Sequence, residues 1–269
     1  MRGIWRIVQA EILKQHRNTF HSRYMYFALL IWPVVIFINA YYDFKPFNLS
    51  DSMSEYFTSV ESMVTFLITG FLAYNSFGAL VQSAWMMSFE RRNGTLEMVF
   101  LSPANRMAII YGRTLGALFQ NIWMFLIFAV FVTICFQGIP LMNLLYLPLV
   151  FLILTLSAMI WGGLMNVIFM FSRDAGILFN VFDEPMSLFS GVRVPTAVFP
   201  LWAKVISVIF PLTHTLVIVR SLLIRGSLLG SLPSIGYLIA VCAVMIALTR
   251  IIIAKAEKHG RETGNFSFY

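Results

Sequence analysis

The feature that most constrains the fold of this chain is a stretch of 59 residues, from Thr114 to Ser172, that contains no charged side chain. A helix that crosses the hydrocarbon core of a bilayer needs about 20 apolar residues, so this stretch is too long for one helix. Gln137-Gly138-Ile139-Pro140 interrupts it with residues that are typical of turns. The stretch therefore predicts two membrane-spanning helices joined by a tight turn.

The composition also indicates an integral membrane protein. Hydrophobic residues make up 59% of the chain and charged residues 12%, and the mean hydropathy is +0.80. The charged share is about half that of a soluble domain. Cys135 and Cys242 lie inside apolar runs, which argues against disulfides and cysteine-based metal sites. Most basic residues flank apolar runs, so the pI of about 9.6 does not indicate a nucleic-acid partner.

Six runs in total predict membrane spans. Besides the two between Thr114 and Ser172, they are Tyr24 to Tyr42, about Met63 to Phe89, Ala175 to Val192 and about Leu232 to Thr249. We therefore expect an all-α membrane protein with one transmembrane domain over residues 1–269. Its parts are an interfacial helix over residues 1–23, a six-span bundle over 24–254 and a tail over 255–269.

The interfacial helix is predicted from an apolar stripe near the N-terminus. Ile4, Val8 and Ile12 repeat at helical spacing, while Arg6 and Lys14 lie on other faces, as in an amphipathic helix on a membrane surface. The segment has no continuous apolar core of the length that a signal peptide requires.

The distribution of charge predicts the orientation. Six spans place both termini on one side of the membrane, together with 14 of the 19 basic residues. The other side holds the remaining five and an acidic loop that contains Asp43, Asp51, Glu55 and Glu61. By the positive-inside rule, both termini, the tail and the segment from Glu90 to Pro103 face the cytoplasm.

The segment from Glu90 to Pro103, between the second and third predicted spans, is more elaborate than a connection requires. Thr95 is suited to cap a short helix, and Glu97 falls in its first turn, where the helix dipole favours a carboxylate. Three apolar residues share one face of this helix: Leu96, Val99 and Phe100. The pattern fits both a docking element and a loop that rests on lipid headgroups.

Ser102-Pro103 predicts the end of this short helix, because a residue before proline is disfavoured in the helical region. Ser102 is also a suitable cap for the next helix, and Pro103 suits that helix's first position. The next helix runs through Arg106 and Arg113 into the third span. We therefore expect a rigid elbow that joins a surface helix directly to a membrane helix.

Two shorter apolar pieces lie between Pro195 and Arg225. Val205 to Phe210 and Leu212 to Val219 are separated by Pro211, and each is too short to cross a bilayer. We expect two short re-entrant helices that enter from the outer face and return, with His214 and Arg220 near the outer mouth.

The chain resembles the permeases of type-2 ATP-binding-cassette exporters over nearly its whole length. The resemblance rests first on Asn93-Gly94-Thr95-Leu96-Glu97, Ser102-Pro103 and Arg106. Downstream it rests on Ser190-Gly191-Val192, Pro195, Phe199-Pro200-Leu201-Trp202, Pro211-Leu212-Thr213 and Arg220. The order of the N-terminal amphipathic helix, the six spans and the outer pair also matches that family.

The resemblance implies that the short helix is a cytoplasmic coupling helix that docks on a separate ATPase, with the N-terminal helix beside it. The implied coupling residues are Glu90, Arg91, Arg92, Gly94, Thr95, Leu96, Glu97, Phe100, Ser102 and Pro103. The implied outer-gate residues are Pro195, Pro200, Pro211, Thr213, His214 and Arg220. The chain has no phosphate-binding loop of its own, so ATP and magnesium are expected on the partner and no cofactor on this chain.

Polar residues inside the spans are further candidates. Asp183 and Glu184 are ionisable residues in the fifth predicted span, with Asn180 nearby. We expect these two acids either to line a transport pathway or to have a structural role, such as pairing with Arg193 or Arg173. Other polar residues predict interhelical hydrogen bonds, namely Arg113, Asn121, Asn166 and Asn180, and Gly112 with Gly116 predicts a close helix contact. The four histidines are scattered and predict no metal site.

The predicted function is that of a permease subunit without enzymatic activity, in a bacterial or archaeal cytoplasmic membrane. It pairs with a second permease and two ATPase subunits to export an amphipathic drug, antibiotic or peptide-like molecule. Export of a lipid-linked polysaccharide or glycolipid is the alternative within the family. The rivals from other classes are a lipid-acting membrane enzyme, which requires clustered catalytic groups, and an ion-coupled transporter, which predicts internal repeats.

Overall fold

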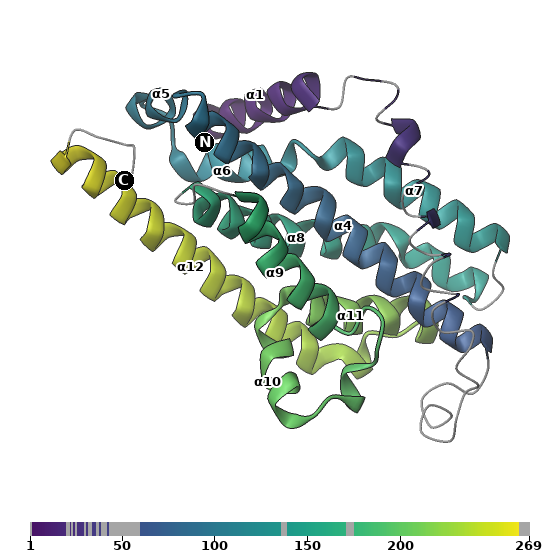
Figure 1. The fold of residues 1–269 in the computed structure, drawn as a ribbon. Helices are drawn as coiled ribbons and strands as arrows, with labels where there is room; N and C mark the ends of the chain where they lie inside the picture. The colour runs from purple at the N-terminus through teal and green to yellow at the C-terminus, as the bar shows by residue number, and fades with distance from the viewer. Residues whose placement is uncertain are drawn as a thin grey trace.

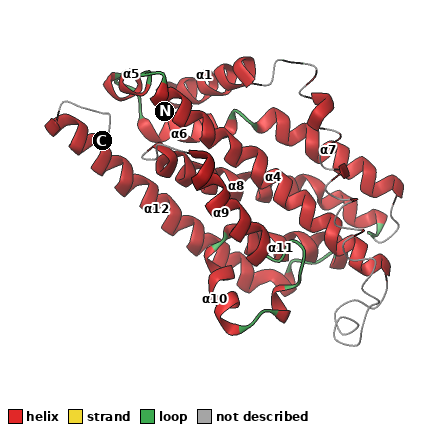
Figure 2. Cartoon of the chain, in the orientation of Figure 1, coloured by secondary structure: helices red, strands yellow, loops and turns green. Residues whose placement is uncertain are grey.

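The computed structural model describes residues 2–19, 60–135, 139–170 and 175–263, with scattered positions between 22 and 42. Within these residues the chain is helical and contains no strand, as expected (Figure 2). The longer helices are α1 (Arg2–Thr19), α4 (Val60–Arg92), α6 (Arg106–Leu115), α7 (Leu118–Cys135), α8 (Leu147–Met170), α9 (Ala175–Phe189), α11 (Pro211–Arg225) and α12 (Leu232–Thr263). The shorter ones are α5 (Leu96–Leu101), η1 (Leu141–Tyr146), η2 (Thr196–Val198), α10 (Leu201–Ile209) and η3 (Leu229–Ser231).

Four described helical stretches are long and apolar enough to cross a membrane: Ser62–Ala84, Arg106–Val130, Met142–Met170 and Leu229–His259. They cover the predicted second, third, fourth and last spans. The pair α10 and α11, bent by 91°, makes a fifth if it is counted as one span. The first predicted span lies largely outside the described residues, as do residues 136–138 of the predicted turn.

The fifth predicted span is shorter than expected. The run from Ala175 to Val192 forms α9, which has 15 residues and ends at Phe189. At 1.5 Å per residue, α9 is about 22 Å long, which is less than the thickness of a bilayer core. Gly191 follows with φ +80°, a conformation that glycine adopts at little cost and that terminates helices.

The core of the molecule lies around α4. This helix crosses the centre of the bundle beside α8, with α7, α9 and α11 packed around it (Figure 1). Within the apolar stretch of α4, 78% of the residues are buried, whereas the corresponding value for α12 is 22%. Phe71 and Phe77 of α4 are almost completely buried. Each aromatic side chain buries a large apolar area against the neighbouring helices, which favours a central position for α4.

The bend between α10 and α11 is fixed by local chemistry. Pro211 stands at the first position of α11, where its missing N–H is tolerated. The Thr213 hydroxyl donates to the Ser207 carbonyl at 2.6 Å, and His214 Nε2 donates to the Val208 carbonyl at 3.1 Å. Both carbonyls belong to the last turn of α10, where the helical ladder ends, and the Ser207 carbonyl also accepts from the Phe210 amide at 3.3 Å. The two helices are therefore locked at their corner.

Candidate functional site

The short helix α5 follows α4 through a tight turn. Gly94 has φ +70°, in the left-handed region that favours glycine, and thereby allows the chain to reverse. Thr95 stands at the N-cap position as predicted, but its hydroxyl donates back to the Glu90 carbonyl at 3.0 Å and forms no cap bond to α5. The hydroxyl binds the end of α4 because the turn brings that orphan carbonyl within reach.

The end of α5 confirms one prediction and corrects another. Ser102 is extended, with ψ 149°, as expected of a residue before proline. However, Ser102 does not cap the next helix, and Pro103 is not its first residue. α6 begins at Arg106 and is capped by Asn105, whose side chain accepts from the Ala108 amide at 3.1 Å. The Ser102 hydroxyl instead donates to Val99 O at 2.9 Å.

Arg106 holds the elbow between α5 and α6 together. Its guanidinium donates to the carbonyls of Phe100 and Ala104, each at 2.5 Å, and of Ser102 at 2.7 Å. Its Nε also donates to Glu257 Oε1 at 2.9 Å, which connects the elbow to the end of α12. One side chain thus fixes the linker after α5 to two long helices. A cleft of about 450 Å³ opens beside this contact, between the linker and α12.

The two sides of α5 have different surroundings. Phe100 is buried, and the Arg106 guanidinium lies 5.7 Å from its ring centroid. Met98 and Leu101 project the other way and are 71% and 74% exposed. Neither was among the candidate residues. The side chains of Arg91, Arg92, Leu96 and Glu97, which were, lie outside the described residues.

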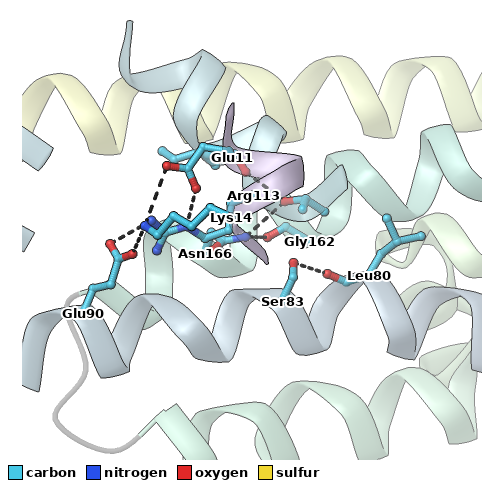
Figure 3. A network of polar contacts seen from close by, with 10 residues as sticks. Glu11, Lys14, Leu80, Ser83, Glu90, Arg113, Gly162 and Asn166 are labelled. Atoms are coloured by element: carbon cyan, nitrogen blue, oxygen red, sulfur yellow. Dashed lines mark hydrogen bonds and ion pairs between the residues drawn. The ribbon is translucent and has the colours of Figure 1, made fainter. Parts of the chain in front are cut away.

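A second polar network joins α1, α4 and α6. Arg113, with no exposed side-chain surface, donates to Glu90 Oε2 at 2.7 Å, and its Nε lies 3.7 Å from Glu11 Oε2. Lys14 donates to the other Glu90 oxygen at 2.5 Å. Figure 3 shows the two carboxylates on either side of these cations. The buried Arg113 is thereby compensated, as a charge away from water must be.

The network sets the charge of Glu90. Burial raises the pKa of this carboxyl, but the nearby Arg113 and Lys14 outweigh burial, so the pKa falls below its ordinary value of 4.5. Glu90 is therefore ionised at neutral pH and holds both cations. Glu90 was a predicted coupling residue, whereas Lys14 and Glu11 were not assigned a role of this kind.

Gly112 and Gly116 allow α1 to approach α6 closely. A Cβ on Gly112 would lie 3.0 Å from Val8 Cα, and one on Gly116 would lie 2.4 Å from Gln15 Cβ. The predicted close helix contact is therefore present, and its partner is the N-terminal helix.

Besides Arg113, which bonds Glu90 of α4, two of the other polar residues form the predicted interhelical hydrogen bonds. Asn121 of α7 donates to Thr155 of α8 at 3.2 Å, and Asn166 of α8 donates to Thr114 of α6 at 3.1 Å. Asn180 on α9 is exposed instead.

The adjacent acidic residues of α9 have different environments. Asp183 is partly buried and accepts from the Tyr74 hydroxyl of α4 at 2.5 Å, and Glu184 is exposed. Asp183 forms no ion pair with the predicted partner Arg193, and Arg173 lies outside the described residues. Among the residues that the structure describes, no three His, Cys, Asp or Glu side chains gather as metal ligands.

The predicted outer-gate residues lie on two neighbouring segments. Pro195 and Pro200 precede η2 and α10, while Pro211, Thr213 and His214 form the corner with α11. Arg220 lies further along α11 and reaches α4 and the loop after α9.

The contacts of Arg220 are with uncharged groups. Its guanidinium donates to the carbonyls of Gly191 at 2.9 Å and Phe66 at 3.1 Å, and to the Thr69 hydroxyl at 3.3 Å. No described carboxylate lies within ion-pair distance of it. Arg220 thus joins three segments of the outer region through hydrogen bonds.

Comparisons with known proteins agree with this arrangement. A family model described as "ABC-2 type transporter" matches residues 2–224, which include α5 and both polar networks except Glu257. The chain is also 24% identical over 206 residues to "Putative transport permease ycf38" of Cyanophora paradoxa. That alignment covers 75% of this chain and 67% of the relative.

Proposed function

The chain belongs to the ABC-2 type transporter family and is a multi-pass transmembrane subunit of an ABC transporter, and from this premise we propose that it forms the export pathway for an amphipathic drug, antibiotic or peptide-like molecule. Two copies, or one copy and a related permease, enclose the pathway. Two cytoplasmic ATPase subunits bind ATP and magnesium and drive the cycle. The complex lies in a bacterial or archaeal cytoplasmic membrane with both termini of this chain, and α5, in the cytoplasm.

The proposed docking surface for the ATPase is the exposed side of α5. Met98 and Leu101 place two large apolar side chains in water, which is costly unless another surface covers them. Buried apolar anchors of this kind supply much of the affinity of protein interfaces. Arg91, Arg92 and Glu97 are proposed as their polar surroundings.

The observation that carries the proposal is the set of contacts made by Arg106. A force on α5 reaches the linker through the Phe100, Ser102 and Ala104 carbonyls. It passes into α6, which continues into the candidate span Arg106–Val130, and into α12 through Glu257. The network of Glu90 and Arg113 adds α4 and α1. Movement of the ATPase subunits is thus transmitted to four helices.

At the other end of the bundle, we assign the outer gate to the bent pair α10 and α11. Their locked corner makes them one unit, and Arg220 attaches this unit to α4 and to the loop after α9. Loss of the Arg220 contacts would allow the pair to swing away from the bundle.

The docking surface is tested by Met98→Arg. A charged side chain at a buried apolar contact opposes docking, so ATP-dependent transport and co-purification of the ATPase should both fall, by about tenfold. Met142 is 79% exposed at the first residue of the candidate span Met142–Met170, where an arginine can extend to the headgroups, so Met142→Arg is the control and should leave both measurements unchanged.

Two results would contradict the proposal. One is a native complex that contains no ATPase subunit. The other is a Met98→Arg variant that transports and retains its ATPase as well as the Met142→Arg control.

A further inference from the structure

One face of α9 combines an apolar surface with a single carboxylate. Ile177, Val181, Glu184 and Leu188 follow one another at intervals of four, three and four residues, so they form one stripe along the helix. All four are exposed, the apolar three by 63%, 55% and 57%. Glu184 is thus the one acid in an otherwise apolar stripe, with the exposed amide of Asn180 one turn before it.

The neighbouring Asp183 fixes the depth of this stripe. Its carboxylate accepts from the Tyr74 hydroxyl, and Tyr74 lies 12 residues after Ser62 and 10 before Ala84, the ends of a candidate span. At 1.5 Å per residue, Tyr74 is about 18 Å and about 15 Å from those ends. The pair, and Glu184 beside it, therefore lie near the middle of that candidate span.

The two acids are not equivalent. Asp183 points toward the core, where Phe182 packs against the buried cluster and Met186 is fully buried. Its Oδ2 is engaged by Tyr74, while its Oδ1 is buried without a hydrogen-bond partner. Glu184 points outward, and no described cation forms an ion pair with it. Among the described residues, the Glu184 carboxylate thus has no cation in direct contact at a depth where an ionised group is expensive.

The stripe does not suit lipid or a symmetric protein contact. Ionisable groups at this depth face a water-filled cavity or a partner rather than acyl chains. If two copies met about a twofold axis that passed beside Glu184, each Glu184 would approach the other, because residues at such an axis pair with themselves. Two facing carboxylates repel unless a cation lies between them. In either arrangement a cationic group would complement the Glu184 carboxylate.

From this geometry we propose that the stripe formed by Ile177, Val181, Glu184 and Leu188 is a binding site for a cationic amphipathic cargo. The apolar side chains contact the body of the cargo, and the Glu184 carboxylate binds its positive group. Asn180 supplies a hydrogen bond at the edge of the site, and Asp183 with Tyr74 anchors α9 to α4 behind it. This inference rests on the exporter function proposed above and names the chemical class of its cargo.

The test uses two ions of similar size and shape but opposite charge, tetraphenylphosphonium and tetraphenylborate. Equilibrium binding of each is measured to the purified complex in lipid nanodiscs. The wild type should bind tetraphenylphosphonium and discriminate against tetraphenylborate. Glu184→Gln should weaken binding of the cation by about tenfold without weakening binding of the anion. Glu184→Asp should restore most of the cation binding.

Glu262→Gln serves as the control, since Glu262 is an exposed carboxylate at the end of α12 that lies 3.8 Å from Lys258 Nζ. It should bind both ions as the wild type does. Elution of each variant as the intact complex on a sizing column excludes misfolding as the cause of lost binding.

Three outcomes would overturn the proposed cargo site. They are equal binding of the two ions by the wild type, unchanged cation binding by Glu184→Gln, and dissociation of the permease pair in Glu184→Gln, which would assign the stripe to a subunit contact. The exporter function fails by a separate result, the absence of an ATPase from the complex, because binding of the ions is measured without ATP.

Discussion

Arg106, Arg113 and Arg220 join segments that are far apart in the sequence. Arg106 contacts Glu257 across 151 residues, Arg113 contacts Glu11 and Glu90, and Arg220 reaches Phe66 across 154 residues. A guanidinium has five N–H donors in a rigid plane, so it binds several acceptors at once, which a lysine ammonium does less well. At Arg106 and Arg113 the charge and the geometry are both used, whereas the hydrogen bonds of Arg220 use the arrangement of its donors.

At the residue scale, the lowered pKa of Glu90 predicts a pH dependence. Because the folded-state pKa lies below 4.5, the ion pairs of Glu90 stabilise the fold above about pH 4.5, and this stabilisation is lost as the pH falls through the lowered pKa. Glu90→Gln should therefore reduce the free energy of unfolding by about 2 kcal/mol at pH 7.

The measurement for Glu90 is thermal unfolding in detergent between pH 3 and pH 7. The gap in Tm between wild type and Glu90→Gln should close as the pH falls below about 4.5. Glu262→Gln, which removes an exposed carboxylate, should show almost no gap. A Glu90→Gln gap that stays constant over this range would show that the ion pairs do not cause it.

At the element scale, local signals predicted some boundaries and missed others. Ser102 ends α5 because of the proline that follows, and this steric rule needs no tertiary contact. The start of α6 was misplaced because Ser102 and Asn105 are both good capping residues. In the structure Asn105 is the residue that caps α6. Arg106, which follows it, donates to the carbonyls of the linker, and a local sequence pattern does not predict these contacts.

Other parts of the candidate site depend on contacts that one sequence does not specify. The spacing of Gly112 and Gly116 predicted a close contact but not that α1 makes it. The charges of Arg106 and Glu257 gave no sign that they pair. Met98 and Leu101 were missed because an apolar residue on a short helix does not reveal whether it faces the protein or water. The sequence predicted a fifth span that is longer than α9. The end of α9 could have been predicted locally, because Gly191 is a residue type that commonly terminates helices.

The contact between α1 and α6 predicts a steric effect at Gly116. Gly116→Ala should lower Tm by several degrees, because the new Cβ would lie 2.4 Å from Gln15 Cβ and push α1 away from α6. Gly78 lies in α4 with nothing near its added Cβ, so Gly78→Ala should leave Tm unchanged or raise it.

Thermal unfolding of the two alanine variants, with cysteine accessibility at an introduced Gln15→Cys as a second readout, checks this effect. Exposure of position 15 should increase in Gly116→Ala alone. Equal Tm values for the two variants would mean that α1 is not held against Gly116.

At the scale of the whole molecule, α4 links the ends of the bundle. This helix has 33 residues and is about 50 Å long. Near one end Phe66 and Thr69 bind Arg220, in the middle Tyr74 binds Asp183, and near the other end Glu90 binds Lys14 and Arg113. A shift of α4 along its axis would therefore change the contacts with Arg220, with Asp183 and with Lys14 and Arg113 at the same time.

Arg220→Gln tests the outer end of this arrangement. The shorter neutral side chain cannot reach the Gly191 and Phe66 carbonyls together, so amide hydrogen exchange should rise in residues 190–211. Arg225→Gln, an exposed position on the same helix, should leave this exchange unchanged. The outer region is held by other contacts if Arg220→Gln exchanges no faster than Arg225→Gln.

The packing of α1 also has a consequence for the order in which the chain is made. Gly116 follows Gln15 by 101 residues, and Arg113 follows Glu11 by 102. At 5–20 residues per second, the ribosome needs on the order of 5–20 s to produce the surface on which α1 rests. During that interval the N-terminal helix has no protein partner in α6. The interfacial position that the sequence predicts for α1 would hold it against the lipid headgroups until the candidate span Arg106–Val130 has been made.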